Sequence, residues 1–408
     1  MLDRLWFGFF AVAGLAALQR WIGGDPAVFG AIVASLFQMA REAVQLMLLL
    51  FGTLTLWLGL LRIAERAGLV ERLARRLAPL FRVLMPGVPD GHPALGLVTL
   101  NFAANVLGLD NAATPIGLRA MRELQSLNPS TEVASDAQIL FMVLNASSLT
   151  LLPVSIFMYR AQQGAADPTL VFLPILLATT ASTAVGLLSV AWLQRLPLWR
   201  AARWLLPAAA LLAALLAALG SLSAAALAAA SSLAGNLLLF GVVLAFLGAG
   251  AWRRVPLFDA FIDGARDGFA VARDLLPYLV AMLCAVGVLR ASGALDEVLG
   301  AIRWAVHGVG LDTRFVDALP IALVKPLSGS AARALLIETM QHSGVDSFPA
   351  LLGATMQGST ETTFYVLAVY FGAVGIRRVR HAVGCALLAD LAGVLASIAV
   401  CYWFFGAR

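Results

Sequence analysis

The chain has 408 residues, of which 61% are hydrophobic and 12% are charged, and its formal net charge at pH 7 is +5. Soluble domains carry about 25% charged residues, so this composition excludes an ordinary soluble enzyme and predicts a polytopic membrane protein. Arginine carries the basic excess, since Lys325 is the only lysine in the sequence. Arginine-rich loops on the cytoplasmic side of a membrane explain this better than a nucleic-acid surface, so we expect no nucleic-acid partner.

The residue types that carry chemistry form no enzyme or metal signature. Cys284, Cys385 and Cys401 fall in apolar segments without the spacing of metal ligands or of a disulfide framework. The sequence contains no P-loop and no His-Glu-x-x-His motif. We therefore expect no catalytic residue, no cofactor and no metal. An intramembrane hydrolase that uses a serine is disfavoured, because no serine is accompanied by a convincing His/Asp arrangement.

Nine apolar stretches have the length and composition of membrane helices. They cover residues 5–22, 43–63, 135–160, 169–193, 203–219, 233–251, 275–291, 347–373 and 379–404. We expect the first to be a retained helix, because it lacks the small-residue cleavage site of a signal peptide. Residues 63–84 and 255–274 place charges among apolar residues and predict amphipathic helices on the membrane surface. The Ala- and Leu-rich stretch 204–247 predicts two closely packed linker helices.

Polar and helix-breaking residues interrupt the apolar sequence at 100–115, which we call the first island. Gly108 is expected to break a helix, and Asn111 to cap a new one with Pro115 in its first turn. Such a half-helix presents free backbone N–H groups and a positive dipole end to a ligand. The candidate binding residues are Asn101, Asn105, Asp110, Asn111 and Thr114. The alternative is that the asparagines only hold helices together.

The second island covers residues 323–333. Lys325 precedes Pro326, and Ser330 is expected to cap a new helix. A lysine and an arginine at the start of a half-helix suit an anionic or strongly polar ligand. The candidate binding residues are Lys325, Ser328, Ser330 and Arg333. In the alternative, Lys325 forms a purely structural pair with a carboxylate; the choices are Asp110, Glu361 and Asp390.

A third polar cluster lies at 357–363. On a continuous helix, Gln357, Thr360 and Glu361 would share one face. Asn145 and Ser148 would share the equivalent face in the first half, so all five are candidate binding residues. A further hypothesis assigns proton or ion coupling to two ionisable residues within membrane helices, Glu361 and Asp390. Asp390 could instead be the partner of Arg333 or Lys325.

The same order of features appears in 41–192 and in 266–403: an apolar helix, an amphipathic stretch, a broken polar segment and two apolar helices. We divide the chain accordingly. The expected parts are an N-terminal helix and loop (1–40), a first repeat (41–197), linker helices (198–254) and a second repeat (255–408).

The arginines predict how the helices are oriented. They follow 43–63, 169–193 and 233–251, so these helices should run inward. The helix at 275–291 must then run outward, opposite to its counterpart at 43–63. If each broken segment re-enters from one side, the two halves are inverted repeats, which is the architecture of many secondary transporters. The N-terminus would then lie in the cytoplasm and the C-terminus outside.

Three motifs resemble known families. Residues 101–121 resemble the signature of the bacterial spore maturation protein A family, although Asp110 stands where glycine is expected. Residues 325–340, and more closely 356–372, resemble spore maturation protein B, so the chain looks like a fusion of the two. Both families belong to the nucleoside-recognition or Gate group, which is also similar to parts of nucleoside transporters and of the ferrous-iron transporter. The resemblance implies a transporter-like protein of the inner membrane and leaves its substrate open.

The sequence thus predicts an all-α, multi-pass protein of the bacterial inner membrane. We expect about nine transmembrane helices, two broken or re-entrant segments and two inverted Gate-like repeats. Its expected partners are a small polar solute and the lipid bilayer, and a homo-oligomer is compatible with the sequence. The expected function is to bind or move that solute, with a nucleoside as one candidate. The alternative is a membrane scaffold or maturation factor of the spore or cell envelope that transports nothing.

Overall fold

A computed structural model describes residues 2–108 and 110–406 of the chain. The backbone alone is described for residues 2–5, 46, 49–50, 110–112, 271–272, 274–275 and 278. Over the described ranges the chain is helical and forms no strand, with a single isolated bridge between Val133 and Arg378. Its long apolar helices are those of an all-α membrane protein, as the sequence predicts.

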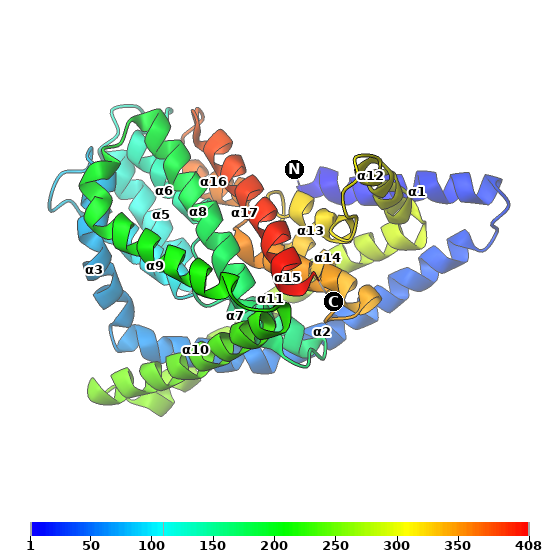
Figure 1. The fold of residues 1–408 in the computed structure, drawn as a ribbon, viewed down its shortest axis with the longest axis horizontal. Helices are drawn as coiled ribbons and strands as arrows, with labels where there is room; N and C mark the ends of the chain where they lie inside the picture. The colour runs from blue at the N-terminus through cyan, green and yellow to red at the C-terminus, as the bar shows by residue number, and fades with distance from the viewer. Residues whose placement is uncertain (1, 109, 407–408) are drawn as a thin grey trace. The chain divides into compact units, whose positions relative to one another are not determined.

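Short connections in the sequence join the helices to one another (Figure 1). In chain order they are α1 (Leu2–Ile22), α2 (Val28–Arg66), α3 (Leu69–Leu84), α4 (Pro93–Val106), α5 (Asp110–Ser126), α6 (Asp136–Ser147), α7 (Val154–Gln162), η1 (Pro168–Val171), α8 (Phe172–Gln194), η2 (Leu198–Ala201), α9 (Ala202–Gly220), α10 (Ala224–Trp252), α11 (Leu257–Ala291), α12 (Ala294–Gly308), η3 (Val316–Ala318), α13 (Leu319–Val324), α14 (Gly329–Ser343), α15 (Phe348–Ser359), α16 (Thr363–Gly372) and α17 (Ala382–Phe405).

Four helices in the described ranges are long and apolar enough to cross a membrane. They are Pro168–Gln194, Leu198–Gly220, Ala224–Trp252 and Ala382–Phe405. The pair Leu279–Ala291 and Ala294–Gly308, which is bent by 67°, would make a fifth if it formed one span. Nine spans are therefore not confirmed, and the inverted orientation of the two halves stays a prediction.

Two of the predicted spans are interrupted, so the expectation of continuous helices at 135–160 and 347–373 is wrong. In the first, α6 ends at Ser147 and α7 begins at Val154, directly after Pro153. In the second, α15 ends at Ser359 and α16 begins at Thr363. Pro153 lacks an N–H and disfavours helix in the residue before it, which helps to explain the first interruption. The amphipathic stretch 255–274, expected as a separate surface helix, is instead continuous with the apolar part of α11.

The chain forms two compact units. The first contains Met1–Leu60, Ser155–Pro168 and Phe258–Gln357; the second contains Leu61–Val154, Thr169–Leu257 and Gly358–Arg408. Each unit draws on both halves of the sequence. The first island lies in the second unit and the second island in the first, so their meeting near the membrane midplane stays a prediction, as do the predicted repeat boundaries.

In the first unit, the buried Arg160 joins distant segments. Its guanidinium donates to the carbonyl oxygen of Pro168 at 3.2 Å and to that of Val345 at 3.0 Å. It also pairs with the Asp346 carboxylate at 2.8 Å. Because an arginine side chain with 0% exposure would be costly without partners, these contacts stabilise α7 against the loop before α15.

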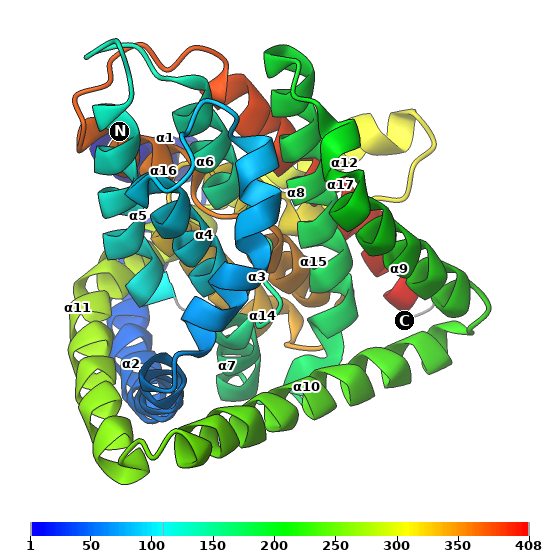
Figure 2. The same cartoon turned by 90° about the vertical axis from the view of Figure 1, so that its left-hand side faces the viewer.

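In the second unit, α8 and α17 lie side by side (Figures 1 and 2). A Cβ built on Gly186 of α8 would lie 3.2 Å from the Cβ of Ala389 in α17, so the missing side chain lets the two helices approach closely. The first half of α10 packs against η1 and the start of α8, where the Ser231 hydroxyl donates to the Leu170 carbonyl at 2.7 Å and accepts from the Leu173 N–H at 3.0 Å.

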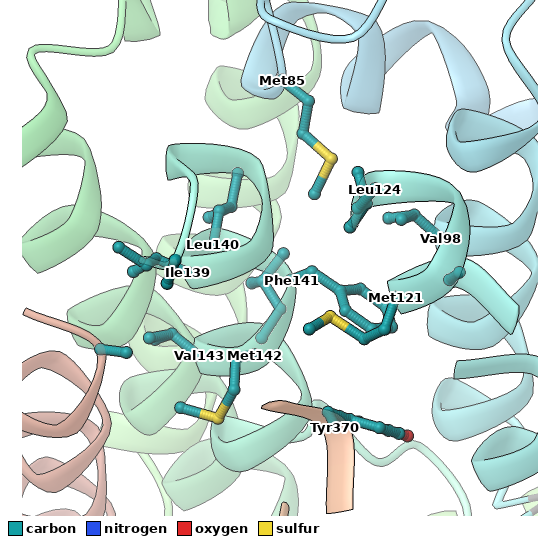
Figure 3. Close-up of a cluster of buried hydrophobic side chains, with 14 of the residues drawn as sticks. Met85, Val98, Met121, Leu124, Ile139, Leu140, Phe141, Met142, Val143 and Tyr370 are labelled. Atoms are coloured by element: carbon teal, nitrogen blue, oxygen red, sulfur yellow. The ribbon is translucent and has the colours of Figure 1, made fainter. Parts of the chain in front are cut away.

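The apolar core of this unit lies among α3, α4, α5 and α6 (Figure 3). Met85, Met121, Leu124 and Phe141 are buried there and pack against one another. Tyr370 of α16 lies at the edge of the same cluster, and the centroid of its ring is 5.5 Å from that of the Phe141 ring. This core fixes α4, α5, α6 and α16, which are the elements that carry the polar residues described next.

Candidate functional site

Each half of the chain contains two interrupted helices, one more than the sequence predicted. In the first half the interruptions separate α4 from α5 and α6 from α7. In the second half they separate α13 from α14 and α15 from α16. Backbone groups freed at such interruptions need partners in an apolar environment, so they mark places where the chain lines a polar site or is bonded to itself.

The first interruption depends on Gly108. Its φ is +71°, and a Cβ built on it would lie 2.7 Å from the carbonyl oxygen of Leu152. The predicted break at Gly108 is therefore confirmed. The predicted helix start is wrong, because α5 begins at Asp110 and Pro115 lies inside it rather than in its first turn. The side chains of Asp110 and Asn111 lie outside the described part of the structure, and Thr114 is half-buried.

The second interruption follows α6, whose last carbonyl groups are bonded by neighbouring segments. Ser148 is left-handed, with φ +33°. Its carbonyl oxygen accepts from the Thr179 hydroxyl of α8 at 2.7 Å, and that of Ser147 accepts from Thr183 at 3.4 Å. Since α6 ends at Ser147, Asn145 and Ser148 do not share the helix face that the sequence predicted.

Backbone hydrogen bonds join three of the interruptions within the second unit. The N–H of Leu151 donates to the carbonyl of Val106 at the end of α4, at 3.1 Å. The N–H of Glu361 donates to the carbonyl of Ala146 at 2.8 Å. The breaks after α4, α6 and α15 therefore meet, and each supplies hydrogen bonds that another would lack in an apolar interior.

A buried polar cluster lies beside these breaks and contains Asn101, Asn105, Asn145 and Tyr370. The Asn105 amide donates to the Asn145 side-chain oxygen at 2.9 Å, and the Tyr370 hydroxyl donates to the same oxygen at 3.4 Å. Asn101 is 0% exposed and donates to the Ala113 carbonyl at 2.8 Å, across the Gly108 break. The structure thus brings Asn145, which the sequence singled out separately, together with Asn101 and Asn105 of the first island.

Tyr370 is a member of this cluster that the sequence analysis missed. Its hydroxyl lies against Gly117 of α5, where a Cβ would clash with it. A tyrosine within an apolar helix usually has a partner for its hydroxyl when buried, and this is the signal that would have identified it.

The break between α15 and α16, here called the third interruption because it is the third of those that meet in the second unit, divides residues 357–363. Because α15 ends at Ser359, Thr360 and Glu361 lie in the extended segment beyond it, so the predicted helix face shared with Gln357 is wrong. Thr360 is buried, and a Cβ on Gly393 of α17 would lie 2.9 Å from its methyl group. Glu361 is half-buried, and its carboxylate has no hydrogen bond to another described residue.

Asp390 of α17 lies next to the third interruption. It is 5% exposed, and its carboxylate accepts from the Thr363 hydroxyl at 2.7 Å. The bond joins α17 to the first turn of α16. Its predicted role in coupling, and its predicted pairing with Arg333 or Lys325, stay predictions.

The second island is built differently from the prediction. Ser328 caps α14, accepting from the Ala331 N–H at 3.2 Å, so Ser330, which lies inside the first turn, is not the cap. Lys325 is 6% exposed and donates from Nζ to the carbonyl of Gln357 near the end of α15, at 3.0 Å. A cation at a helix C-terminus is favoured by the helix dipole. Arg333 bonds back to the Gly329 carbonyl at 3.3 Å.

Gln357 leaves one polar atom unpaired. Its side chain is 6% exposed, and its Oε1 is buried without a hydrogen-bond donor among the described residues. A buried acceptor without a donor costs about 1–3 kcal/mol, and each such group calls for an explanation. Lys325 and Gln357 are thus brought together beside the break before α14, which Ser328 caps, and one buried acceptor there lacks a donor among the described residues.

The comparisons with known proteins agree with this arrangement. A family model described as Gate, nucleoside recognition, matches residues 47–162 and 272–377, which include all four interruptions. Spore maturation protein B of Bacillus subtilis (strain 168) is 41% identical over 165 residues, which are 40% of this chain and 91% of that protein. Spore maturation protein A of the same strain is 38% identical over 148 residues, or 36% of this chain and 76% of that protein.

No solved structure matches the chain. Two separate regions fit one family model, and together they cover more than half of the sequence. The chain is therefore a membrane protein of the Gate (nucleoside recognition) family, homologous over parts of its length to spore maturation proteins A and B.

Proposed function

We propose that this protein is a transporter-like protein of the bacterial inner membrane that binds and moves a small polar solute at its interrupted helices. The family description, nucleoside recognition, makes a nucleoside the first candidate. A nucleoside presents hydroxyl and ring N–H donors together with carbonyl and ring nitrogen acceptors. An amide side chain such as that of Gln357 offers the complementary groups. The proposal includes no enzymatic step and no cofactor.

The observation that carries the proposal is the unpaired Oε1 of Gln357. It is buried beside Lys325, which lies in the break between α13 and α14. Gln357 itself lies near the end of α15, just before the break that separates α15 from α16. A hydroxyl or N–H of a bound solute would give this oxygen a donor. The ammonium of Lys325, which already bonds the Gln357 backbone, would favour a solute with carbonyl or anionic oxygens nearby.

Glu361 and Asp390 are the proposed coupling residues. Both are carboxylates in segments that otherwise read as membrane, and such residues mark ion or proton pathways more often than not. Glu361 lies in the extended segment after α15, and Asp390 contacts the helix that follows it. A proton or cation bound there could alter the third interruption as the solute binds.

The test adds each nucleoside of a panel to the purified protein and detects binding as an increase in the unfolding temperature. The variant Gln357→Leu removes the unpaired oxygen while keeping a side chain of similar length. It should unfold at the same or a higher temperature without solute, since an unpaired buried acceptor is lost, and the solute should no longer stabilise it. Gln38→Leu is the control, because Gln38 is bonded to Glu42 on the surface of α2. Equal stabilisation of Gln357→Leu and wild type would contradict the site.

A second candidate function is that of a membrane scaffold or envelope-maturation factor. Two observations favour it: the relatives are named spore maturation proteins, and the cluster of Asn101, Asn105 and Asn145 is bonded within itself. A purely structural role predicts that no solute of the panel shifts the unfolding temperature, while loss of the asparagine bonds still destabilises the protein. Solute-dependent stabilisation would argue against it.

A further inference from the structure

A pocket of about 410 Å³ lies between α3 and the end of α10, and none of its lining residues belongs to an interrupted helix. It is lined by Arg72 of α3, by Gly248, Ala249 and Trp252 of the last turns of α10, and by Arg253 directly after that helix. All of these residues belong to the second unit.

We propose that this pocket binds the phosphate group of an anionic phospholipid. Among the described residues, neither Arg72 nor Arg253 has a carboxylate within ion-pairing distance. The contact that Arg72 makes is a long one, from Nη2 to the Ala67 carbonyl at 3.4 Å. Each guanidinium carries five N–H donors, so most of them stay available to a phosphate, which arginine binds in a bidentate manner.

The position of the pocket favours a lipid over a soluble anion. Helix α10 has 29 residues and carries no charge, and it passes the length and composition test for a membrane helix. Trp252 is at its end and is 89% exposed. Tryptophan and arginine at the end of an apolar helix are typical of the lipid headgroup region, and basic pockets beside such helices bind anionic headgroups.

Small residues create the hollow and hold its walls together. A Cβ built on Gly248 has no neighbour within 4 Å, so this residue leaves the space open. Gly250, two residues further along on another face of α10, packs against Ile63 of α2, where a Cβ would lie 2.7 Å from the isoleucine methyl. This close approach fixes the end of α10 against the end of α2, directly before α3, and Arg253 and Arg72 line one pocket there.

The test compares lipid binding by matched variants. Purified protein in a neutral detergent is titrated with phosphatidylglycerol or phosphatidylcholine and followed by native mass spectrometry. We expect wild type to prefer phosphatidylglycerol, and Arg72→Gln/Arg253→Gln to bind it about tenfold more weakly through loss of charge-assisted hydrogen bonds. The control Arg75→Gln/Arg76→Gln removes the same charge from exposed positions of α3 outside the pocket and should bind like wild type.

A third variant changes the shape of the pocket without changing its charge. Gly248→Leu should fill the hollow and weaken phosphatidylglycerol binding while all arginines remain. The proposal is overturned if the pocket variants and the control lose binding equally, or if none of them loses it. It is also overturned if inorganic phosphate or glycerol phosphate competes as well as the lipid does, because the site would then be one for a soluble anion.

Discussion

The backbone N–H of Glu361 donates a hydrogen bond of 2.8 Å to the carbonyl oxygen of Ala146. The two residues come from different matches to the Gate family model, and each lies at an interruption of a helix. Because neither group could remain unpaired in an apolar interior, the interruption in one Gate region depends on that in the other. The breaks after α6 and α15 therefore depend on each other, and a change at one should be felt at the other.

Loss of the Thr179 hydroxyl should destabilise the end of α6. In Thr179→Val the Ser148 carbonyl loses its donor at 2.7 Å, which we expect to cost about 1–3 kcal/mol of unfolding free energy. The matched control is Thr180→Val, because the Thr180 hydroxyl bonds only the Leu176 carbonyl of its own helix. Chemical unfolding in detergent measures both, and equal midpoints for the two variants would contradict the role of Thr179.

Substitution of Gly108 should be costly for two reasons. Alanine at φ +71° is strained, and its Cβ would lie 2.7 Å from the Leu152 carbonyl, so Gly108→Ala should lose roughly 2 kcal/mol or more. Gly96→Ala is the control near the start of α4, where a Cβ meets nothing within 4 Å. It should be neutral or stabilise by about 0.5–1 kcal/mol. Unfolding midpoints that shift in the same direction would argue against a required glycine at 108.

His381 should make the stability depend on pH. It precedes α17, outside the apolar span, and its Nε2 lies 3.2 Å from the side-chain nitrogen of Gln194. That amide nitrogen can only donate, so this histidine nitrogen accepts and is unprotonated. Burial, and then the charge of Arg380, lower the pKa of His381 from 6.5, against the opposing effect of Asp136.

A lowered pKa in the folded state stabilises the protein fully above the unfolded pKa of 6.5, and this contribution is lost as pH falls through the folded pKa. The unfolding temperature of wild type should thus decrease below pH 6.5, and His381→Gln should show a smaller decrease. The control His307→Gln removes an exposed histidine of α12 and should keep the wild-type profile. Identical profiles for wild type and His381→Gln would contradict the assignment.

The sequence predicted two of the four interruptions because their causes are local. Gly108 has no Cβ, and Pro326 and Gly329 lie beside the break before α14, so the residues themselves disfavour a continuous helix. The breaks after Ser147 and Ser359 were missed, because their segments are apolar and long enough to span. Their stabilising contacts come from distant residues, Thr179 and the backbone of Glu361 among them, and these are not readable from local pattern.

In the candidate site, too, the sequence identified residues that stand out locally and missed those that depend on distant partners. Asn101, Asn105 and Asn145 stand out in sequence, since amides are rare in apolar segments, and the structure brings them into one cluster. Tyr370 was missed because its partner, Asn145, is 225 residues away. The choice of Ser328 over Ser330 as the cap of α14 depends on where the helix begins, and a pair of serines around one glycine does not decide that.

Uptake of radiolabelled nucleosides into proteoliposomes tests the central claim, a solute site at the interrupted helices, most directly. Wild-type protein should give saturable uptake above that of protein-free vesicles. Gln357→Leu, reconstituted to the same level, should give none above that background, while Gln38→Leu should match wild type. Uptake by Gln357→Leu equal to that of wild type, or no uptake by wild type for any solute of the panel, would contradict the account.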